Sequence, residues 1–214
     1  MEDWGSVYGA WEKVLPLVCQ QIEGELAAFN ASVKREEGDG IYEHILTRIK
    51  SEESMREKCR IRNLPESPES ALGEIQDAIG LRVVTRFIDD IYAIVGFLEG
   101  LEGVRLVRKK DYIRHAKPNG YRSLHVILER QVPFPDFRGE NPGRYFIEVQ
   151  LRTIAMDSWA SLEHQLKYKK QVREAALIVS ELKRCADELA SCDLSMQTIR
   201  NLMREMPREE EKSC

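Results

Sequence analysis

The sequence predicts a single α/β domain (α+β in arrangement), with strands in the middle of the chain and long helices at its two ends. Its 214 residues, 43% of them hydrophobic, suffice for one sizeable core but are short for two independent domains. Alternation of apolar and polar residues, typical of strands, is concentrated in the middle. Spacings of three and four residues, typical of helices, dominate both ends, and this order is typical of one domain with helical flanks.

The N-terminal segment, residues 4–29, has the apolar spacing of an amphipathic helix. A polar stretch with two glycines, residues 36–40, predicts a loop after it. The apolar stripe consists of Trp4, Val7, Trp11, Leu15, Val18, Ile22, Leu26 and Phe29.

The middle of the chain is expected to alternate strands with short helices. Residues 41–49 predict a first short strand and residues 51–60 a short helix. The break at residues 64–68 contains two prolines and is expected to be exposed and mobile. The remaining expected elements are strands over 79–87, 103–109, 121–130 and 144–152, a helix after Asp89 and Asp90, and a helix over 154–169.

The C-terminal segment, residues 173–206, carries a strict seven-residue apolar repeat, which predicts a helix packed against another helix. Two interpretations stay open, and both can hold: the repeat packs on the N-terminal helix of the same chain, or it forms a subunit interface. Cys185 and Cys192 lie on the repeat, which favours a packing role over a redox role. We call these residues the seam: Ile178, Leu182, Cys185, Leu189, Cys192, Met196, Ile199, Met203 and Met206.

The overall charge excludes some classes of partner. Lys and Arg (32) nearly balance Asp and Glu (36), so a net charge of −4 predicts neither a stable nucleic-acid partner nor an anionic membrane. We also expect no signal peptide and no membrane span. Five scattered cysteines without paired spacing are typical of free thiols in a reducing compartment, so we expect a cytoplasmic protein.

The predicted strands have unusually polar faces. In the strand over 144–152 one face is largely polar, and the strands over 79–87 and 121–130 have polar faces as well. A solvated sheet face and a ligand-binding face explain this pattern about equally well. The residues on these faces are Phe146, Glu148, Gln150 and Arg152, then Arg82, Val84 and Arg86, then Tyr121, Ser123, His125 and Ile127.

Two basic segments favour the ligand-binding interpretation. Residues 105–122 hold seven Lys and Arg against one acid, a local positive field suited to a polyphosphate. Within them, the turn at 117–121 places Tyr121 where its ring could stack on a base, although a solvated hairpin with a tyrosine capping the core fits too. Upstream, Arg48 is followed by three polar residues spaced four apart, as on one face of a helix, and this row could contact phosphate groups. Its members are Lys50, Ser54 and Lys58.

Five ordered motifs within residues 48–169 resemble the synthetase motifs of the RelA/SpoT family. Together they are highly specific, whereas each alone would be weak. The short length and the absence of an N-terminal hydrolase motif resemble the single-domain small alarmone synthetases. The motifs are residues 77–82 (DAIGLR), 110–113 (KDYI), 117–125 (KPNGYRSLH), 148–153 (EVQLRT) and 159–164 (WASLEH).

The resemblance implies a nucleotidyltransferase-like mixed sheet flanked by helices, and a homo-oligomer in which a tetramer is favoured. It implies a Mg²⁺-dependent GTP pyrophosphokinase that transfers the β,γ-pyrophosphate of ATP to the 3′-hydroxyl of GTP or GDP, in stringent-response signalling. We expect one synthetase domain over 1–214. Its parts are an N-terminal helix in 1–32, a catalytic core over 41–170, a packing or oligomerisation helix over 171–206 and a tail over 207–214.

The resemblance also implies roles for individual residues. Asp77 and Glu148 would hold the metal, and Glu148 would activate the acceptor hydroxyl. Arg48 and Arg82 would sandwich adenine, and Tyr121 would stack on guanine. The donor phosphates are assigned to Lys50, Ser54 and Lys58, and the acceptor nucleotide to Lys117, Asn119, His125 and Gln150.

The two carboxylates can converge only if their strands are neighbours. Many relatives have glycine where this chain has Thr47, which makes the Arg48 assignment the least secure. Two alternatives remain: a toxic relative that pyrophosphorylates tRNA 3′ ends or adenosine nucleotides, and a non-catalytic nucleotide- or RNA-binding module. The acidic net charge weighs against tRNA, and the presence of both carboxylates weighs against the binding module.

Overall fold

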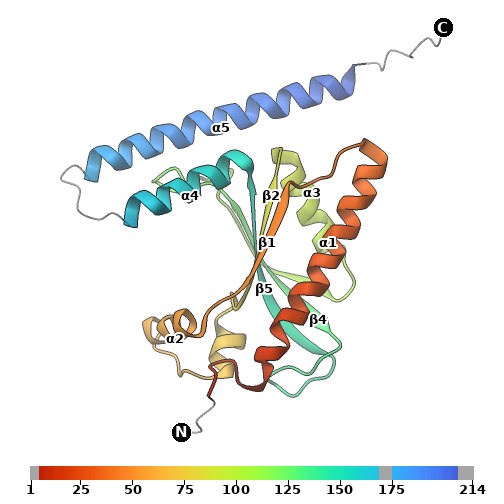
Figure 1. Ribbon diagram of the computed structural model, residues 1–214, viewed down its shortest axis with the longest axis vertical. Helices are drawn as coiled ribbons and strands as arrows, with labels where there is room; N and C mark the ends of the chain where they lie inside the picture. The colour runs from red at the N-terminus through yellow and green to blue at the C-terminus, as the bar shows by residue number, and fades with distance from the viewer. Residues whose placement is uncertain (1–4, 169–174, 207–214) are drawn as a thin grey trace.

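The protein folds around one mixed five-stranded sheet, seen in a computed structural model that describes residues 5–168 and 175–206 (Figure 1). The strand order is β1-β2-β5-β4-β3, and only β2 and β5 run parallel. The expected mixed sheet is therefore confirmed. The strands are β1 (His44–Ile49), β2 (Ile79–Thr85), β3 (Val104–Asp111), β4 (Leu124–Val132) and β5 (Gly143–Thr153).

Helices cover one face of this sheet and lie at its ends (Figure 1). The α-helices are α1 (Leu15–Glu37), α2 (Glu52–Ile61), α3 (Ile88–Glu99), α4 (Ile154–Tyr168) and α5 (Ala175–Glu205). A 3₁₀-helix, η1 (Gly9–Lys13), precedes α1, and a π-helical turn, η2 (Glu69–Glu74), precedes β2. No helix in these described ranges has the length and apolar character needed to cross a membrane.

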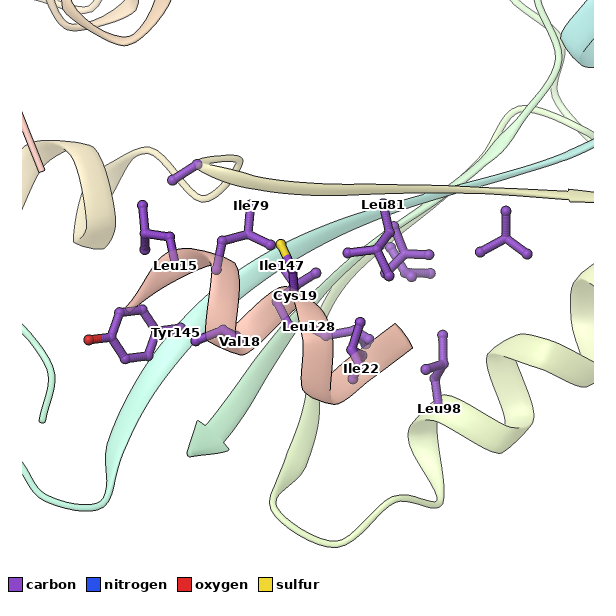
Figure 2. Packing of buried hydrophobic residues seen from close by; sticks show 14 of the residues in the cluster. Leu15, Val18, Cys19, Ile22, Ile79, Leu81, Leu98, Leu128, Tyr145 and Ile147 are labelled. Carbon is purple, nitrogen blue, oxygen red and sulfur yellow. The ribbon is translucent and has the colours of Figure 1, made fainter. Parts of the chain in front are cut away.

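The hydrophobic core lies between one face of the sheet and helices α1 and α3. Figure 2 shows Leu15, Val18 and Ile22 of α1 packed against the central strands. Burying such side chains stabilises a fold by about 1.5–3 kcal/mol each. Because side chains alternate along a strand, the residues between the core positions point to the opposite face. The core positions of the central strands are Ile79, Leu81, Val83, Leu124, Val126, Leu128, Tyr145, Ile147, Val149 and Leu151.

Helix α2 is positioned by a local capping signal. The Ser51 hydroxyl accepts a hydrogen bond from the Ser54 backbone N–H, and acidic residues occupy the first turn while Lys58 lies in the last turn. Both features stabilise a helix through its unpaired amides and its dipole. The predicted helix over 51–60 is confirmed, and it places Lys58 near the start of β2.

The N-terminal prediction was wrong in its boundaries. The α-helix begins at Leu15 rather than near residue 4 and continues to Glu37, where Gly38 ends it with φ 89°. Trp4 lies outside the described residues, and Val7 is fully buried ahead of the helices. The stripe looked continuous because Val7 and the 3₁₀ turn carry apolar residues at helical spacing.

Two further boundaries differ from expectation. The break at 64–68 is exposed at Pro65, but Pro68 is buried and leads into the unpredicted turn η2. The strand expected from residue 121 begins at Leu124, because Gly120, with φ 92°, and Tyr121 belong to the preceding turn. Tyr121 therefore reaches the site from a turn rather than from the sheet.

Helix α5 lies across α4 and the start of α3 rather than along the N-terminal helix (Figure 1). Its inward face is anchored by polar groups: Thr153 donates to Asp193 at 2.6 Å, and Arg200 pairs with Asp90 at 2.5 Å. Of the two interpretations left open for the seam, packing along the N-terminal helix was therefore wrong, since among the described residues α5 reaches the end of α1 through ion pairs of Arg200 and Arg204 with Glu37. The C-terminal half of the seam is exposed, with exposed fractions of 50–69% at Met196, Ile199, Met203 and Met206.

Candidate functional site

Asp77 and Glu148 converge because β2 and β5 are neighbours. In their parallel register Gly80 lies opposite Glu148, and Asp77 precedes β2 by two residues. Both carboxylates line one cavity, and the negative charge of Asp77 acts to raise the pKa of Glu148. The neighbouring strands predicted from the sequence are confirmed.

Two lysines hold the carboxylate of Asp77. Lys50 Nζ lies 2.6 Å and Lys58 Nζ 2.5 Å from the same oxygen, Oδ2. Burial alone would raise the pKa of Asp77, but the two ammonium groups outweigh it and hold the pKa below its ordinary value. The other oxygen, Oδ1, is buried and has no hydrogen-bond partner among the described residues.

The carboxylate of Glu148 stays ionised through its neighbours. The nearby His125 imidazole lowers the pKa of Glu148, burial and the charge of Asp77 oppose this, and the net pKa is lowered. His125 Nδ1 faces Glu148 Oε1 at 3.7 Å, and the Gln150 amide donates to Oε2 at 3.1 Å. An anionic oxygen is thus available at neutral pH.

A cavity of about 150 Å³, here called the arginine cavity, lies beside Glu148 over β1, β2 and β5. Arg48 and Arg82 both line it, as the adenine assignment requires. Burial, then the nearby Arg152, lowers the pKa of Arg82, and Asp157 opposes this shift. The lining residues are Leu46, Thr47, Arg48, Gly80, Leu81, Arg82, Glu148 and Gln150.

A second cavity of about 170 Å³, here called the basic cavity, is lined by both carboxylates and shares Glu148 with the arginine cavity. Its cations face a phosphate-sized space, and Lys117 Nζ lies 4.7 Å from the ring centroids of both Tyr112 and Tyr121. The lining residues are Lys58, Arg62, Gln76, Asp77, Arg108, Lys110, Tyr112, Lys117, His125, Ile127 and Glu148.

The ring of Tyr121 is held at its hydroxyl end. That hydroxyl lies 2.8 Å from His125 Nε2 and accepts a hydrogen bond from Arg152 at 2.8 Å. Its ring also meets the Trp159 ring edge-on, with centroids 6.5 Å apart. These contacts fix the plane of an aromatic ring beside the basic cavity.

Four of the predicted site residues line neither cavity: Lys50, Ser54, Asn119 and Tyr121. Ser54 is exposed and bonds to Ser51, 2.9 Å away, at the start of α2. Asn119 accepts from the Tyr121 backbone N–H and donates to Glu163. The side chain of Asn119 therefore shapes the turn that presents Tyr121.

Sequence reasoning missed several residues of the site. Arg108 and Lys110 belong to the basic stretch but were given no role, and Tyr112 belongs to a quoted motif. Arg152 was placed correctly on the polar face, but its partner Asp157 was not identified. The alternation in β3 and β5 was the available signal for Arg108, Lys110 and Arg152, because the other missed residues lie outside these two strands. The other missed members are Arg62 and Gln76.

The fold and the site together define a class: an α/β protein whose mixed sheet presents two carboxylates at adjoining cationic cavities, suited to phosphate-bearing ligands. The chain belongs to the RelA/SpoT family, since the model for a region found in RelA / SpoT proteins matches residues 47–173. The match covers all the strands except the first three residues of β1.

Curated relatives resemble nearly the whole chain. GTP pyrophosphokinase YwaC of Bacillus subtilis (strain 168) is 35% identical over 188 residues, covering 87% of this chain and 85% of that protein. GTP pyrophosphokinase YjbM of the same strain is 30% identical over 201 residues, covering 91% and 90%.

Solved structures agree with these relatives. The small alarmone synthetase 1 from Bacillus subtilis, crystallised with its product pppGpp, superposes with a TM-score of 0.77 at 27% identity, covering 91% of this chain and 98% of that one. The small alarmone synthetase 2 from Bacillus subtilis gives a TM-score of 0.74 at 34% identity, covering 88% and 96%.

Proposed function

We propose that this chain is a (p)ppGpp synthetase that transfers the β,γ-pyrophosphate of ATP to the 3′-hydroxyl of GTP or GDP. The observation that carries the proposal is the convergence of Asp77 and Glu148 in the basic cavity, with Glu148 also lining the arginine cavity. The relatives described above, which are GTP pyrophosphokinases, support it. The transfer forms a bond from the 3′-oxygen to the β-phosphorus and breaks the α–β bridge, releasing AMP.

Mg²⁺ fits the two carboxylates. Asp77 Oδ1 is a buried anionic oxygen without a hydrogen-bond partner among the described residues, and Glu148 adds a second hard oxygen donor. Mg²⁺ commonly binds through one or two carboxylates together with substrate phosphates. When bound, Mg²⁺ would neutralise charge on the phosphate oxygens. Asp77 and Glu148 would hold it.

The arginine cavity is assigned to the donor. Arg48 and Arg82 would stack on the two faces of adenine, which suits planar guanidinium groups. Lys50 and Lys58, held against Asp77, would turn their ammonium groups to the donor phosphates. Ser54 is exposed on the first turn of α2, so it would contact the donor only if the phosphate chain of ATP extends out to that turn.

The basic cavity is assigned to the acceptor. Tyr121, which lies beside this cavity, would stack on guanine, with Lys117 and His125 contacting the acceptor, while Asn119 would act by shaping the turn. Gln150 lines the arginine cavity and donates to Glu148, so it would meet the acceptor only where that nucleotide reaches Glu148. Glu148 would accept the proton of the 3′-hydroxyl, because its lowered pKa keeps it ionised. Positioning and charge neutralisation contribute most to such transfers.

The test is a product analysis. Purified protein is mixed with Mg²⁺ and labelled ATP, and then separately with GTP, GDP, no acceptor or deacylated tRNA, and products are resolved by anion exchange. Equimolar AMP and a tetra- or pentaphosphorylated guanosine are expected. Glu148→Gln is expected to lower the rate by about 100-fold or more, in the usual range for removing a general base.

A matched control is Glu129→Gln. Glu129 is a residue of β4 on the same face of the sheet as Glu148, but it pairs with Arg105 outside both cavities. Removing its charge should leave the rate within about threefold of wild type once folding is verified. Label only in tRNA or in adenosine products would replace the proposal with the toxin alternative. Tight nucleotide binding without transfer would replace it with the binding module.

We also propose that the chain forms a homo-oligomer, with a tetramer favoured. Supporting this, the C-terminal half of the seam leaves Met196, Ile199, Met203 and Met206 exposed beside a cavity of about 460 Å³. A large apolar patch on a monomer commonly marks an interaction surface.

A further inference from the structure

A chain of polar contacts joins the arginine cavity to Tyr121 through two residues that line neither cavity. Arg82 lies 3.5 Å from the carboxylate of Asp157, and the same oxygen of Asp157 accepts from Arg152 at 2.9 Å. Arg152 then donates its other terminal nitrogen to the Tyr121 hydroxyl at 2.8 Å. Neither Arg152 nor Asp157 is a lining residue.

The chain continues to the carboxylate of Glu148 with a defined direction. A guanidinium can only donate, so the Tyr121 oxygen accepts from Arg152 and its own hydrogen is free for His125 Nε2, 2.8 Å away. In the neutral imidazole the hydrogen then lies on Nδ1, which faces Glu148. The contacts thus run in one direction from Arg152 to Glu148.

The two central residues are held rigidly. The Arg152 side chain is only 6% exposed near the end of β5, and Asp157 lies in the first turn of α4, which follows β5 without a loop. Thr153 caps that turn by accepting from the Met156 backbone N–H. Because strand and helix are continuous here, few flexible bonds lie between Asp157 and Arg152. A displacement of Arg82 against Asp157 is therefore transmitted through Arg152 to the Tyr121 hydroxyl.

We propose that Arg152 and Asp157 are positioning residues that couple the two nucleotide sites, so that a nucleotide bound in one cavity strengthens binding in the other. The proposal rests on the proposed function. A base stacked on Arg82 would hold its guanidinium against Asp157, which orders Arg152 and thereby the ring of Tyr121. The acceptor base would then meet an already ordered ring, and the effect must be reciprocal.

Calorimetric titration tests this without transfer, using α,β-methylene ATP and GDP on the full chain. In the wild type, saturating analogue should tighten GDP binding about fivefold or more, at the lower end of usual coupling. Tyr121→Phe keeps the ring but removes the hydroxyl. It should abolish the tightening while leaving the affinity for the analogue alone unchanged.

Asp157→Asn keeps the shape but removes the charge between two guanidinium groups. It should abolish the tightening and weaken both nucleotides, although Asp157 contacts neither. Arg152→Lys retains a charge for Asp157 but lacks the planar guanidinium that also reaches Tyr121. This variant should therefore bind each nucleotide as the wild type does but lose the tightening between them. The matched control is Asp187→Asn, an exposed carboxylate paired with Arg122, which should keep the tightening.

Retained tightening in Tyr121→Phe or Arg152→Lys, with normal melting temperatures, would overturn the coupling role even if Asp157→Asn fails to fold. If the wild-type chain binds both nucleotides but neither changes the affinity for the other, the coupling proposal is overturned and the proposed function stands. Binding and tightening without transfer would overturn the proposed function instead. A wild-type chain that binds neither nucleotide would overturn both.

Discussion

Gly80 of β2 lies directly opposite Glu148 of β5, so the position across from the central carboxylate carries no side chain. A Cβ placed on Gly80 would lie 3.4 Å from both Cγ and Nε of Arg48. That distance is ordinary van der Waals contact, so a small side chain fits there but a larger one does not. Gly80 therefore leaves space for Arg48 at the arginine cavity.

Gly80→Val is expected to narrow the arginine cavity, at a cost in stability that still allows the chain to fold. Valine suits a strand, but its branched methyl groups would press on Arg48, and overpacking of this kind costs about 1–3 kcal/mol. The affinity for α,β-methylene ATP should fall about tenfold or more, whereas the affinity for GDP alone should not change. Calorimetry measures both. Gly80→Ala is the matched control and should bind the analogue within about threefold of wild type, since its Cβ makes only ordinary contacts.

Asp77→Asn is expected to destabilise the fold as well as to abolish transfer. It would leave Lys50 and Lys58 beside each other without their shared anion, at a cost of about 1–3 kcal/mol. The lowered pKa of Asp77 means that its contribution is present above the unfolded pKa of about 4 and is lost as the pH falls through the folded pKa. Urea unfolding should therefore separate the variant from wild type at pH 7, and the difference should shrink as the pH falls below about 4. Equal stabilities at pH 7 would contradict this, and Glu57→Gln, an exposed carboxylate on α2, serves as control.

Asp193→Asn is expected to stabilise the protein at neutral pH. Burial raises the pKa of Asp193, and the amide oxygen of asparagine can still accept the bond from Thr153. For a raised folded pKa, the stabilising contribution is present below the unfolded pKa and is lost as the pH rises through the folded pKa. The variant should melt roughly 2–4 °C higher at pH 7.5, corresponding to about 1 kcal/mol, and the difference should shrink near pH 4. A lower melting temperature at pH 7.5 would show that the ionised carboxylate is stabilising through Arg122.

Ile199→Glu together with Met203→Glu is expected to break the proposed assembly. Both side chains are at least half exposed, so charges there should cost the monomer little but should be excluded from an apolar interface. Light scattering should show a fall to the monomer mass of 24.7 kDa with unchanged circular dichroism. Thr198→Glu, rotated by about 100° on α5, is the control and should retain the mass of wild type. An unchanged mass in the double variant would count against the seam as an interface.

The strands were predictable because the core enforces alternation. In β5, residues 145, 147, 149 and 151 face α1 and α3, so the polar face bearing Glu148 could be identified without a structure. The adjacency of β2 and β5 followed only from requiring that Asp77 and Glu148 meet. Sequence alone does not specify strand order, because the pairing partners are far apart along the chain.

The inward face of α5 could not be predicted from its apolar repeat. The C-terminal half of the helix is anchored by Asp193, Gln197 and Arg200, which bond to residues of other elements, so its inward face there is polar rather than apolar. A seven-residue apolar repeat indicates where a helix can pack, not whether its partner belongs to the same chain. Asp157 was missed for a similar reason, since its partner Arg82 is far from it along the chain and becomes its neighbour only in the folded protein.

The parallel pairing of β2 with β5 also constrains the order of events during synthesis. It joins residue 79 to residue 147, a non-local contact of the kind that slows folding, and no antiparallel hairpin can substitute for it. The two carboxylates therefore cannot meet on a nascent chain until β5 has left the ribosome. A prematurely terminated product that ends before residue 143 lacks Glu148 altogether and would be catalytically silent.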